Sequence, residues 1–190
     1  MAGHPCVMPA ERHAALPPPA PKDSLRIYKL CVVCLGNICR SPMAETLIRA
    51  ELAAAGLAER VSVESAGTGD WHLGEPMDRR ARAELTRRGY DGSAHRARQI
   101  GAAWLDQFDL LIAMDASNLR NLRLMAPGRS DLAGRIRLFR SFDPAAAEGA
   151  QVPDPYDGGP EEFARVFDIV HAAARGLVAA LAELLGPAGD

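Results

Sequence analysis

The apolar pattern of the chain becomes regular near Leu25. In the run L-R-I-Y-K-L-C-V-V, which ends at Val33, polar and apolar residues alternate at first and are then all apolar. This pattern is typical of a strand that enters a buried sheet. Three further short apolar runs, beginning at Val61, Phe108 and Arg135, also have strand character. The sequence therefore predicts a sheet of about four short strands.

Helical patterns occupy the segments between and after these strands. The segment S-P-M-A-E-T-L-I-R-A-E-L-A-A-A-G has a candidate cap in Ser41, a first-turn proline in Pro42 and a terminating glycine in Gly56. An exposed basic helix is expected over Met77–Arg88, and a further helix over S-N-L-R-N-L-R-L-M. The last helix is predicted by an apolar stripe at helical spacing, which consists of Phe163, Val166, Phe167, Val170, Ala174, Leu177, Val178 and Leu181.

Strands and helices alternate along the chain, and this alternation favours a parallel sheet with helices on both faces. We therefore expect one three-layer α/β domain over residues 25–187, with no internal repeat. In such folds ligands bind beyond the carboxyl ends of the strands, near the point where the strand order switches. The loop after the first strand should lie there.

Composition restricts the class of protein. The segment before the domain, residues 1–24, contains A-A-L-P-P-P-A-P-K-D and is expected to be a disordered extension. It lacks a basic region followed by an apolar stretch, and no run in the chain approaches the roughly 18 apolar residues of a membrane helix. With 22 basic and 24 acidic residues, the chain shows no basic excess that would favour nucleic-acid binding.

Three of the four cysteines lie close together, at Cys31, Cys34 and Cys39, and the fourth is Cys6. This clustering does not resemble a disulfide framework, and we expect a reduced, cytoplasmic protein. The C-x-x-C spacing of Cys31 and Cys34 suggests a redox pair or half a zinc site. However, residues three apart in a strand point to opposite faces, and no later cysteine pair exists. We therefore place Cys31 in the core and expect no metal or cofactor.

The run C-L-G-N-I-C-R-S-P, residues 34–42, lies between a predicted strand and a predicted helix. Successive backbone N–H groups in such a loop can hold the oxygens of a phosphate, and Arg40 can add a bidentate cation. Cys34 would face the same positive field as a thiolate and act as a nucleophile. The residues that we expect to surround the phosphate are Leu35, Gly36, Asn37, Ile38, Cys39 and Ser41.

A general acid is expected in the loop D-P-Y-D-G-G-P before the last helix. Asp154 could protonate a departing phenolate and then accept a proton from the attacking water. Tyr156 and Trp71 are aromatic residues in polar loops and could form walls for a flat phenyl ring. On composition alone the loop could equally be a simple turn, and Trp71 could equally be structural.

These segments together resemble the low-molecular-weight protein-tyrosine phosphatase family over about residues 28–186. V-C-L-G-N-I-C-R-S-P-M-A-E resembles its nucleophile loop, and D-P-Y-D-G resembles its general-acid loop. E-S-A-G-T-G-D-W-H, A-H-R-A-R-Q-I and M-D-A-S-N-L-R resemble the blocks between them, in order. The N-terminal extension has no counterpart in the family. Asp157 stands where many vertebrate members have a second tyrosine, which points to a bacterial member.

The resemblance implies further roles. Asn37, Ser65 and His95 would form a hydrogen-bond network that holds the phosphate loop in a strained shape. Asp115 would support the loops near the active site, and Cys39 could form a protective disulfide with Cys34. The implied activity is hydrolysis of phosphotyrosine in protein substrates through a phosphocysteine intermediate, by a monomer or a weak dimer.

Three alternatives stay open on the same loop. A protein-arginine phosphatase would carry Thr at the position of Ile38. The branched apolar side chain of Ile38 suits an aromatic ester better than Thr would. An arsenate reductase would need later cysteines, and none follows Cys39. A non-enzymatic phosphopeptide-binding module could dispense with Cys34 or Asp154, yet both are present.

Overall fold

A computed structural model describes residues 16–18 and 27–186. Most of the expected N-terminal extension lies outside these residues. Within it, Leu16 is buried against the domain, and the carbonyl of Pro17 accepts a hydrogen bond from the hydroxyl of Tyr28 at 3.2 Å. Residues 16–18 therefore lie against the start of the first strand.

The sheet has four parallel strands in the order β2-β1-β3-β4. Each predicted apolar run is a strand, and the observed bounds are β1 Tyr28–Cys34, β2 Val61–Gly67, β3 Leu110–Ala113 and β4 Ile136–Leu138. The single α/β domain with a short parallel sheet is therefore confirmed. Strand β1 pairs with β2 on one side and β3 on the other, so the strand order switches at β1. The loop after β1 lies at this switch, as expected.

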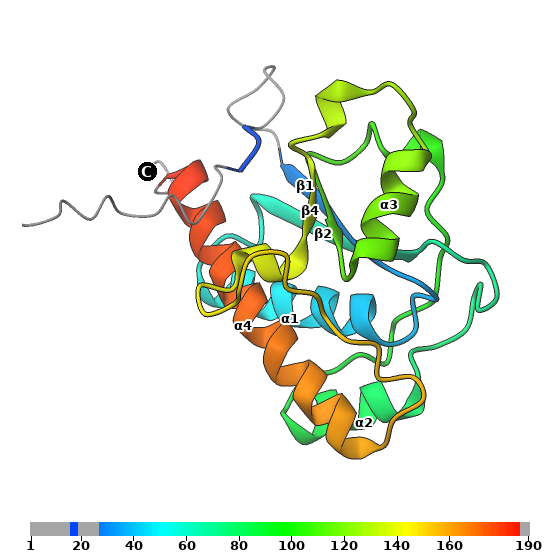
Figure 1. Cartoon of the computed structure of the whole chain (residues 1–190). Helices are drawn as coiled ribbons and strands as arrows, with labels where there is room; N and C mark the ends of the chain where they lie inside the picture. Colours follow the sequence, from blue (N-terminus) through cyan, green and yellow to red (C-terminus); the bar gives the residue numbers. More distant parts are fainter. Residues whose placement is uncertain (1–15, 19–26, 187–190) are drawn as a thin grey trace, which may run out of the picture.

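Helices cover both faces of the sheet (Figure 1). Their bounds are α1 Arg40–Ala54, α2 Arg79–Arg87, α3 Ala116–Leu124 and α4 Pro160–Leu185. Short 3-10 helices occur at Ala102–Trp104 (η1), Ser130–Leu132 (η2) and Phe139–Phe142 (η3). Helices α1 and α4 pack together on one face, α2 packs against α4, and α3 lies on the opposite face (Figure 1). No helix in the described ranges has the length and apolarity to span a bilayer.

The core is divided by the sheet into two clusters, and β1 contributes alternate residues to each. Leu30, Val32 and Cys34 face α1 and α4, whereas Cys31 and Val33 face the side of α3. The placement of Cys31 in the core, opposite Cys34, is therefore confirmed. All eight residues of the predicted apolar stripe on α4 are buried. Helix α2 is less exposed than expected, because Ala81, Glu84 and Leu85 are buried.

The prediction that Ser41 caps α1 is wrong. The helix begins at Arg40 with Cys39 at the N-cap, and no side chain caps it. Ser41 lies inside the first turn, where its hydroxyl turns back toward the sulfur of Cys34. The expected end is correct, since Gly56 follows the last turn with a left-handed φ of 69°.

Candidate active site

Cys34 is the last residue of β1, and its sulfur is enclosed by hydrogen-bonding groups. The backbone N–H of Asn37 donates to Sγ at 3.2 Å, and the hydroxyl oxygen of Ser41 lies 3.1 Å from it. Donors directed at a sulfur stabilise its anionic form. The curled loop, residues 35–39, thus holds the cysteine at the base of a turn that leads into α1.

Asn37 is the centre of this loop. Its φ of 55° is the left-handed conformation, which asparagine tolerates better than most residues. Its side-chain amide donates to the hydroxyls of Ser41 and Ser65, each at 2.9 Å, and its side-chain oxygen accepts from the backbone N–H of Arg98 at 2.8 Å. Asn37 is therefore the residue of this loop that has a left-handed φ, whereas Gly36 does not have one.

His95 and Glu45 complete the network around Asn37. The Nε2 atom of His95 lies 2.7 Å from the carbonyl oxygen of Asn37, so its N–H donates to that oxygen. Burial lowers the pKa of His95 below its usual value, although the bond to Asn37 opposes this shift. The hydroxyl of Ser65 donates to the carboxylate of Glu45 at 2.5 Å. Glu45 was not singled out in the sequence, because it reads as an ordinary exposed residue of α1.

Two glycines bring neighbouring segments close to the loop. A Cβ on Gly67, at the end of β2, would lie 2.7 Å from the carbonyl oxygen of Leu35. A Cβ on Gly36 would lie 3.0 Å from the ring of His72. The backbone N–H groups of Thr68 and Gly69 donate to the carbonyls of Cys34 and Leu35, each at 2.9 Å. The absence of side chains at both glycines therefore allows the segment after β2 to support the phosphate loop.

Arg40 is buried and links the start of α1 to two other segments of the chain. Its guanidinium donates to the carboxylate of Asp115 at 2.6 Å, to the carboxylate of Asp154 at 2.5 Å and to the carbonyl of Val152 at 3.3 Å. Asp115 is also the N-cap of α3, where its other oxygen accepts from the N–H of Asn118 at 2.8 Å. The arginine is thus oriented by the start of α3 on one side and by the loop before α4 on the other.

The phosphate loop and the loop before α4 enclose a cavity of about 300 Å³. Asp154 is 42% exposed at its side chain and shares the cavity with Cys34 and Arg40. The residues that line the cavity are Cys34, Leu35, Gly36, Ile38, Cys39, Arg40, Trp71, His72, Asp154, Tyr156 and Asp157. A cysteine, a guanidinium and a carboxylate therefore converge on one pocket with two exposed aromatic walls, Trp71 and Tyr156.

The structure brings nearly all the residues that the sequence singled out to this pocket or to its support. Asn37 and Ser41 differ in position from the other loop residues, since both are fully buried and neither side chain lines the cavity. Ser65, His95 and Asp115 lie behind the loop, in contact with Asn37 or Arg40. Burial raises the pKa of the Cys39 thiol.

His72 lines the cavity and was missed in the sequence. Its Nδ1 lies 2.7 Å from a carboxylate oxygen of Glu75, and its ring centroid lies 6.4 Å from that of Tyr156. Its position directly after Trp71 was the available signal, since a short loop places neighbours on the same rim. No group of three or more His, Cys, Asp or Glu side chains within residues 16–18 and 27–186 is arranged to hold a metal ion.

Comparison with known proteins identifies a consistent set of relatives. Residues 29–185 match the family described as low molecular weight phosphotyrosine protein phosphatase. A low molecular weight protein-tyrosine-phosphatase of Streptomyces coelicolor is 50% identical over 157 residues, which are 82% of this chain and 94% of that protein. Low molecular weight protein-tyrosine phosphatase A of Mycobacterium tuberculosis is 44% identical over 146 residues, covering 76% and 86% respectively.

Solved structures agree with the sequence matches. A protein tyrosine phosphatase from Entamoeba histolytica superimposes with a TM-score of 0.77 at 35% identity, covering 82% of this chain and 97% of that one. A Bacillus subtilis protein superimposes with a TM-score of 0.75 at 36% identity, covering 83% and 96%. The similarity therefore extends over almost the whole length of each relative.

Proposed function

This chain belongs to the low molecular weight phosphotyrosine protein phosphatase family, and we propose that it hydrolyses phosphotyrosine through a covalent phosphocysteine at Cys34. The observation that carries the mechanism is the convergence of Cys34, Arg40 and Asp154 on one cavity of about 300 Å³. A cysteine beneath a cation, with a carboxylate at the rim, fits a phosphate ester that enters with its phosphorus toward the sulfur.

In the first step, the thiolate of Cys34 attacks the phosphorus, and the bond between phosphorus and the tyrosine oxygen breaks. The electron pair of this bond goes to the phenolate oxygen, which takes the proton of the Asp154 carboxyl group. Arg40 and the loop N–H groups bind the phosphoryl oxygens, where negative charge is held throughout. The phosphate is then attached to the sulfur, and the tyrosine is released.

In the second step, water attacks the phosphorus of the phosphocysteine. The Asp154 carboxylate takes a proton from this water, the phosphorus–sulfur bond breaks, and the electron pair returns to Cys34. The products are inorganic phosphate and the original thiolate. The group at Asp154 thus acts as an acid and then as a base, which leaves the enzyme unchanged after one cycle.

The test is a series of phosphate esters with leaving groups of increasing stability, applied to Asp154→Asn and Arg40→Lys beside the parent. Asp154→Asn should slow esters with poor leaving groups by roughly 10²–10⁴-fold, the usual range for lost general-acid catalysis, and should affect stable leaving groups much less. Its affinity for a phosphate analogue should be unchanged or higher, because the carboxylate that competes for Arg40 is gone. Arg40→Lys should weaken analogue binding and slow every ester, since an ammonium cannot replace the bidentate guanidinium.

Asp157→Asn is the matched control, because Asp157 lines the same cavity from the same loop. It should keep the leaving-group dependence of the parent. Equal slowing of all esters by Asp154→Asn would exclude Asp154 as the acid and would make Asp157 the next candidate.

We further propose that phosphotyrosine proteins of the cytoplasm are the substrates and that residues 25–187 form the catalytic domain, acting as a monomer or a weak dimer. The exposed rings of Trp71 and Tyr156 support an aromatic ester as substrate. Parallel assays of phosphotyrosine and phosphoarginine peptides test this preference, and faster hydrolysis of phosphoarginine would contradict it.

A further inference from the structure

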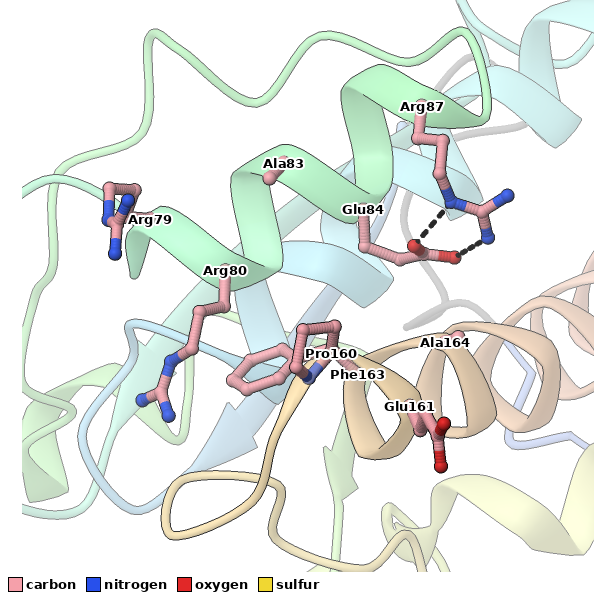
Figure 2. Close-up of a pocket in the computed structure, with 9 residues that line it drawn as sticks. All are labelled: Arg79, Arg80, Ala83, Glu84, Arg87, Pro160, Glu161, Phe163 and Ala164. Carbon is pink, nitrogen blue, oxygen red and sulfur yellow. Dashed lines mark hydrogen bonds and ion pairs between the residues drawn. The ribbon is translucent and has the colours of Figure 1, made fainter.

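A second cavity, of about 490 Å³, lies between α2 and the first turns of α4 (Figure 2). Its apolar surface comes from Ala83, Pro160, Phe163 and Ala164, and its charged rim comes from Arg79, Arg80, Glu84, Arg87 and Glu161. We call this cavity the α2–α4 groove. An apolar floor with a rim of three arginines and two glutamates is a combination that an extended peptide with an anionic side chain would fit.

The groove adjoins the active site through Arg80. The guanidinium of Arg80 lies 4.7 Å from the ring centroid of Phe163, in the groove, and 5.6 Å from that of Tyr156, in the catalytic cavity. It also donates to the carbonyl of Gly158, in the loop that carries Asp154, at 2.9 Å. A chain that places its phosphotyrosine over Cys34 therefore has the α2–α4 groove beside it.

The charges of the groove are unequally compensated. Arg80 is paired with Asp78 at 3.0 Å, and Arg87 shares the carboxylate of Glu84 with Arg88. Arg79 is exposed, and its side chain makes no hydrogen bond or ion pair with any described residue. Glu161 points away from α2 and does not approach Arg79 (Figure 2).

The stability of α2 does not account for Arg79. A positive side chain in the first turn of a helix is unfavourable with the helix dipole, and this position favours an acidic residue. Over residues 78–88 the segment carries five arginines against Asp78 and Glu84, a net charge of +3 (5 − 2). Of the three arginines that line the groove, Arg80 and Arg87 are ion-paired, so the uncompensated positive charge at its rim is that of Arg79, next to the site proposed to receive an anionic substrate.

We propose that the α2–α4 groove binds the substrate chain next to its phosphotyrosine and that Arg79 selects acidic residues there. This inference rests on the proposed function for the placement of the phosphotyrosine. An Asp or Glu side chain, or a second phosphorylated residue, pairs with Arg79 while the neighbouring backbone covers Phe163. The groove therefore sets substrate preference and takes no part in the chemical steps.

The test uses short peptides with a central non-hydrolysable phosphonate analogue of phosphotyrosine. Acidic peptides carry Glu on the N-terminal side, the C-terminal side or both, and the matched neutral peptide carries Gln. Binding is measured by fluorescence anisotropy at low and high salt. The parent should favour at least one acidic peptide. Arg79→Gln should reduce this preference about twofold to fivefold, as expected for one exposed ion pair, and Arg79→Glu should reduce it further.

Controls separate charge at the groove from charge in general. Arg79→Lys should retain most of the preference, and high salt should weaken the preference of the parent. Arg82→Glu makes the same charge change at an exposed position of α2 outside the groove lining, and should have a smaller effect. All the Arg79 variants should hydrolyse phenyl phosphate at the parent's rate, because this ester is too small to reach the groove.

The outcomes distinguish this inference from the proposed function. A parent that binds acidic and neutral peptides equally, or binds neither, overturns the groove proposal, as does an equal effect of Arg82→Glu and Arg79→Glu. A parent that shows Arg79-dependent binding but does not hydrolyse phosphotyrosine supports the groove and overturns the proposed function.

Discussion

Two carboxylates bind Arg40 through different nitrogens of its guanidinium, and they are not held equally. Asp115 also caps α3 and is 20% exposed at its side chain, whereas Asp154 is 42% exposed and lies in the loop before α4. A phosphate dianion that binds Arg40 should therefore displace Asp154 and leave Asp115 in place. Displacement would free Asp154 at the rim, where the leaving oxygen of the substrate would lie. The firmer hold on Asp115 fits its proposed role in orienting Arg40, and the greater exposure of Asp154 fits its proposed role as the proton donor.

At the residue scale, we expect Cys34→Ser to abolish turnover without unfolding the protein. Serine can keep the contacts with Ser41 and Asn37, but its hydroxyl is a far weaker nucleophile than a thiolate. Phosphate binding should persist because Arg40 and the loop N–H groups are unchanged. Turnover assays, circular dichroism and phosphate binding measure the three properties, and substantial activity in the variant would contradict the mechanism.

At the scale of elements, the phosphate loop carries a thiol at each end. Cys34 ends β1, Cys39 is the residue before α1, and both line the same cavity. Burial raises the pKa of Cys39, so this residue stays a thiol at neutral pH. Cys31 also has a raised pKa through burial, and it faces the other side of the sheet.

Mild peroxide should therefore inactivate the enzyme reversibly, through a disulfide between Cys34 and Cys39. A sulfenic acid at Cys34 would be trapped by the nearby thiol, and dithiothreitol would restore activity. Cys39→Ala should make the loss largely irreversible. Mass mapping measures the bridge, and a bridge from Cys34 to Cys31, or overoxidation of the parent without any bridge, would refute the prediction.

Close contact between α4 and η3 depends on a glycine within the helix. A Cβ on Gly176 would lie 1.8 Å from the carbonyl oxygen of Phe142. Because this atom belongs to the backbone, it cannot move aside as the end of a side chain would. Helix propensity favours alanine here, but the contact between elements requires glycine.

Gly176→Ala should consequently destabilise the protein, although alanine gains about 1 kcal/mol of helix propensity. Overpacking costs about 1–3 kcal/mol or more, and a backbone clash at this distance should exceed the gain. The free energy of unfolding in urea measures the balance. Ala179→Gly, at an exposed position of the same helix, gives the propensity difference alone. A more stable Gly176→Ala variant would show that η3 moves away at little cost.

At the scale of the whole molecule, stability is linked to the protonation of the phosphate-loop network. His95 reaches Asn37 from a distant segment, and burial lowers its pKa below the ordinary value of 6.5. The unfolded chain therefore takes up a proton as the pH falls below about 6.5, before the folded protein does. Acid consequently lowers the free energy of unfolding, by at most about 1.4 kcal/mol per pH unit for one proton.

His95→Gln should flatten this dependence. The glutamine amide can still donate to the carbonyl of Asn37, but it does not titrate between pH 7 and pH 5. Urea unfolding of parent and variant across that range measures the difference in slope. The stability that neutral His95 contributes is fully retained above the pKa of this residue in the unfolded chain. It is lost as the pH falls through the lower pKa of His95 in the folded protein. Parallel curves for the two proteins would show that His95 does not contribute to acid sensitivity.

The sequence by itself determined the order of elements and singled out the loop after β1 as the candidate site. The four strands, the apolar stripe of α4 and the core position of Cys31 all follow from local periodicity. Cys34 and Arg40 could be paired because they flank one short loop, at the end of β1 and the start of α1. Periodicity and turn residues depend on a few neighbouring positions, so they can be recognised before the fold is known.

Only the tertiary structure decided what surrounds that loop. Asp154 contacts Arg40 across 114 positions of the chain, and Asp115 does so across 75. The contacts of Glu45 and Arg80, and the left-handed turn at Asn37, gave no local signal of their role. Such contacts arise because packing of α1, α2 and α4 on the sheet brings distant segments together, and no short-range pattern encodes where separate elements will meet.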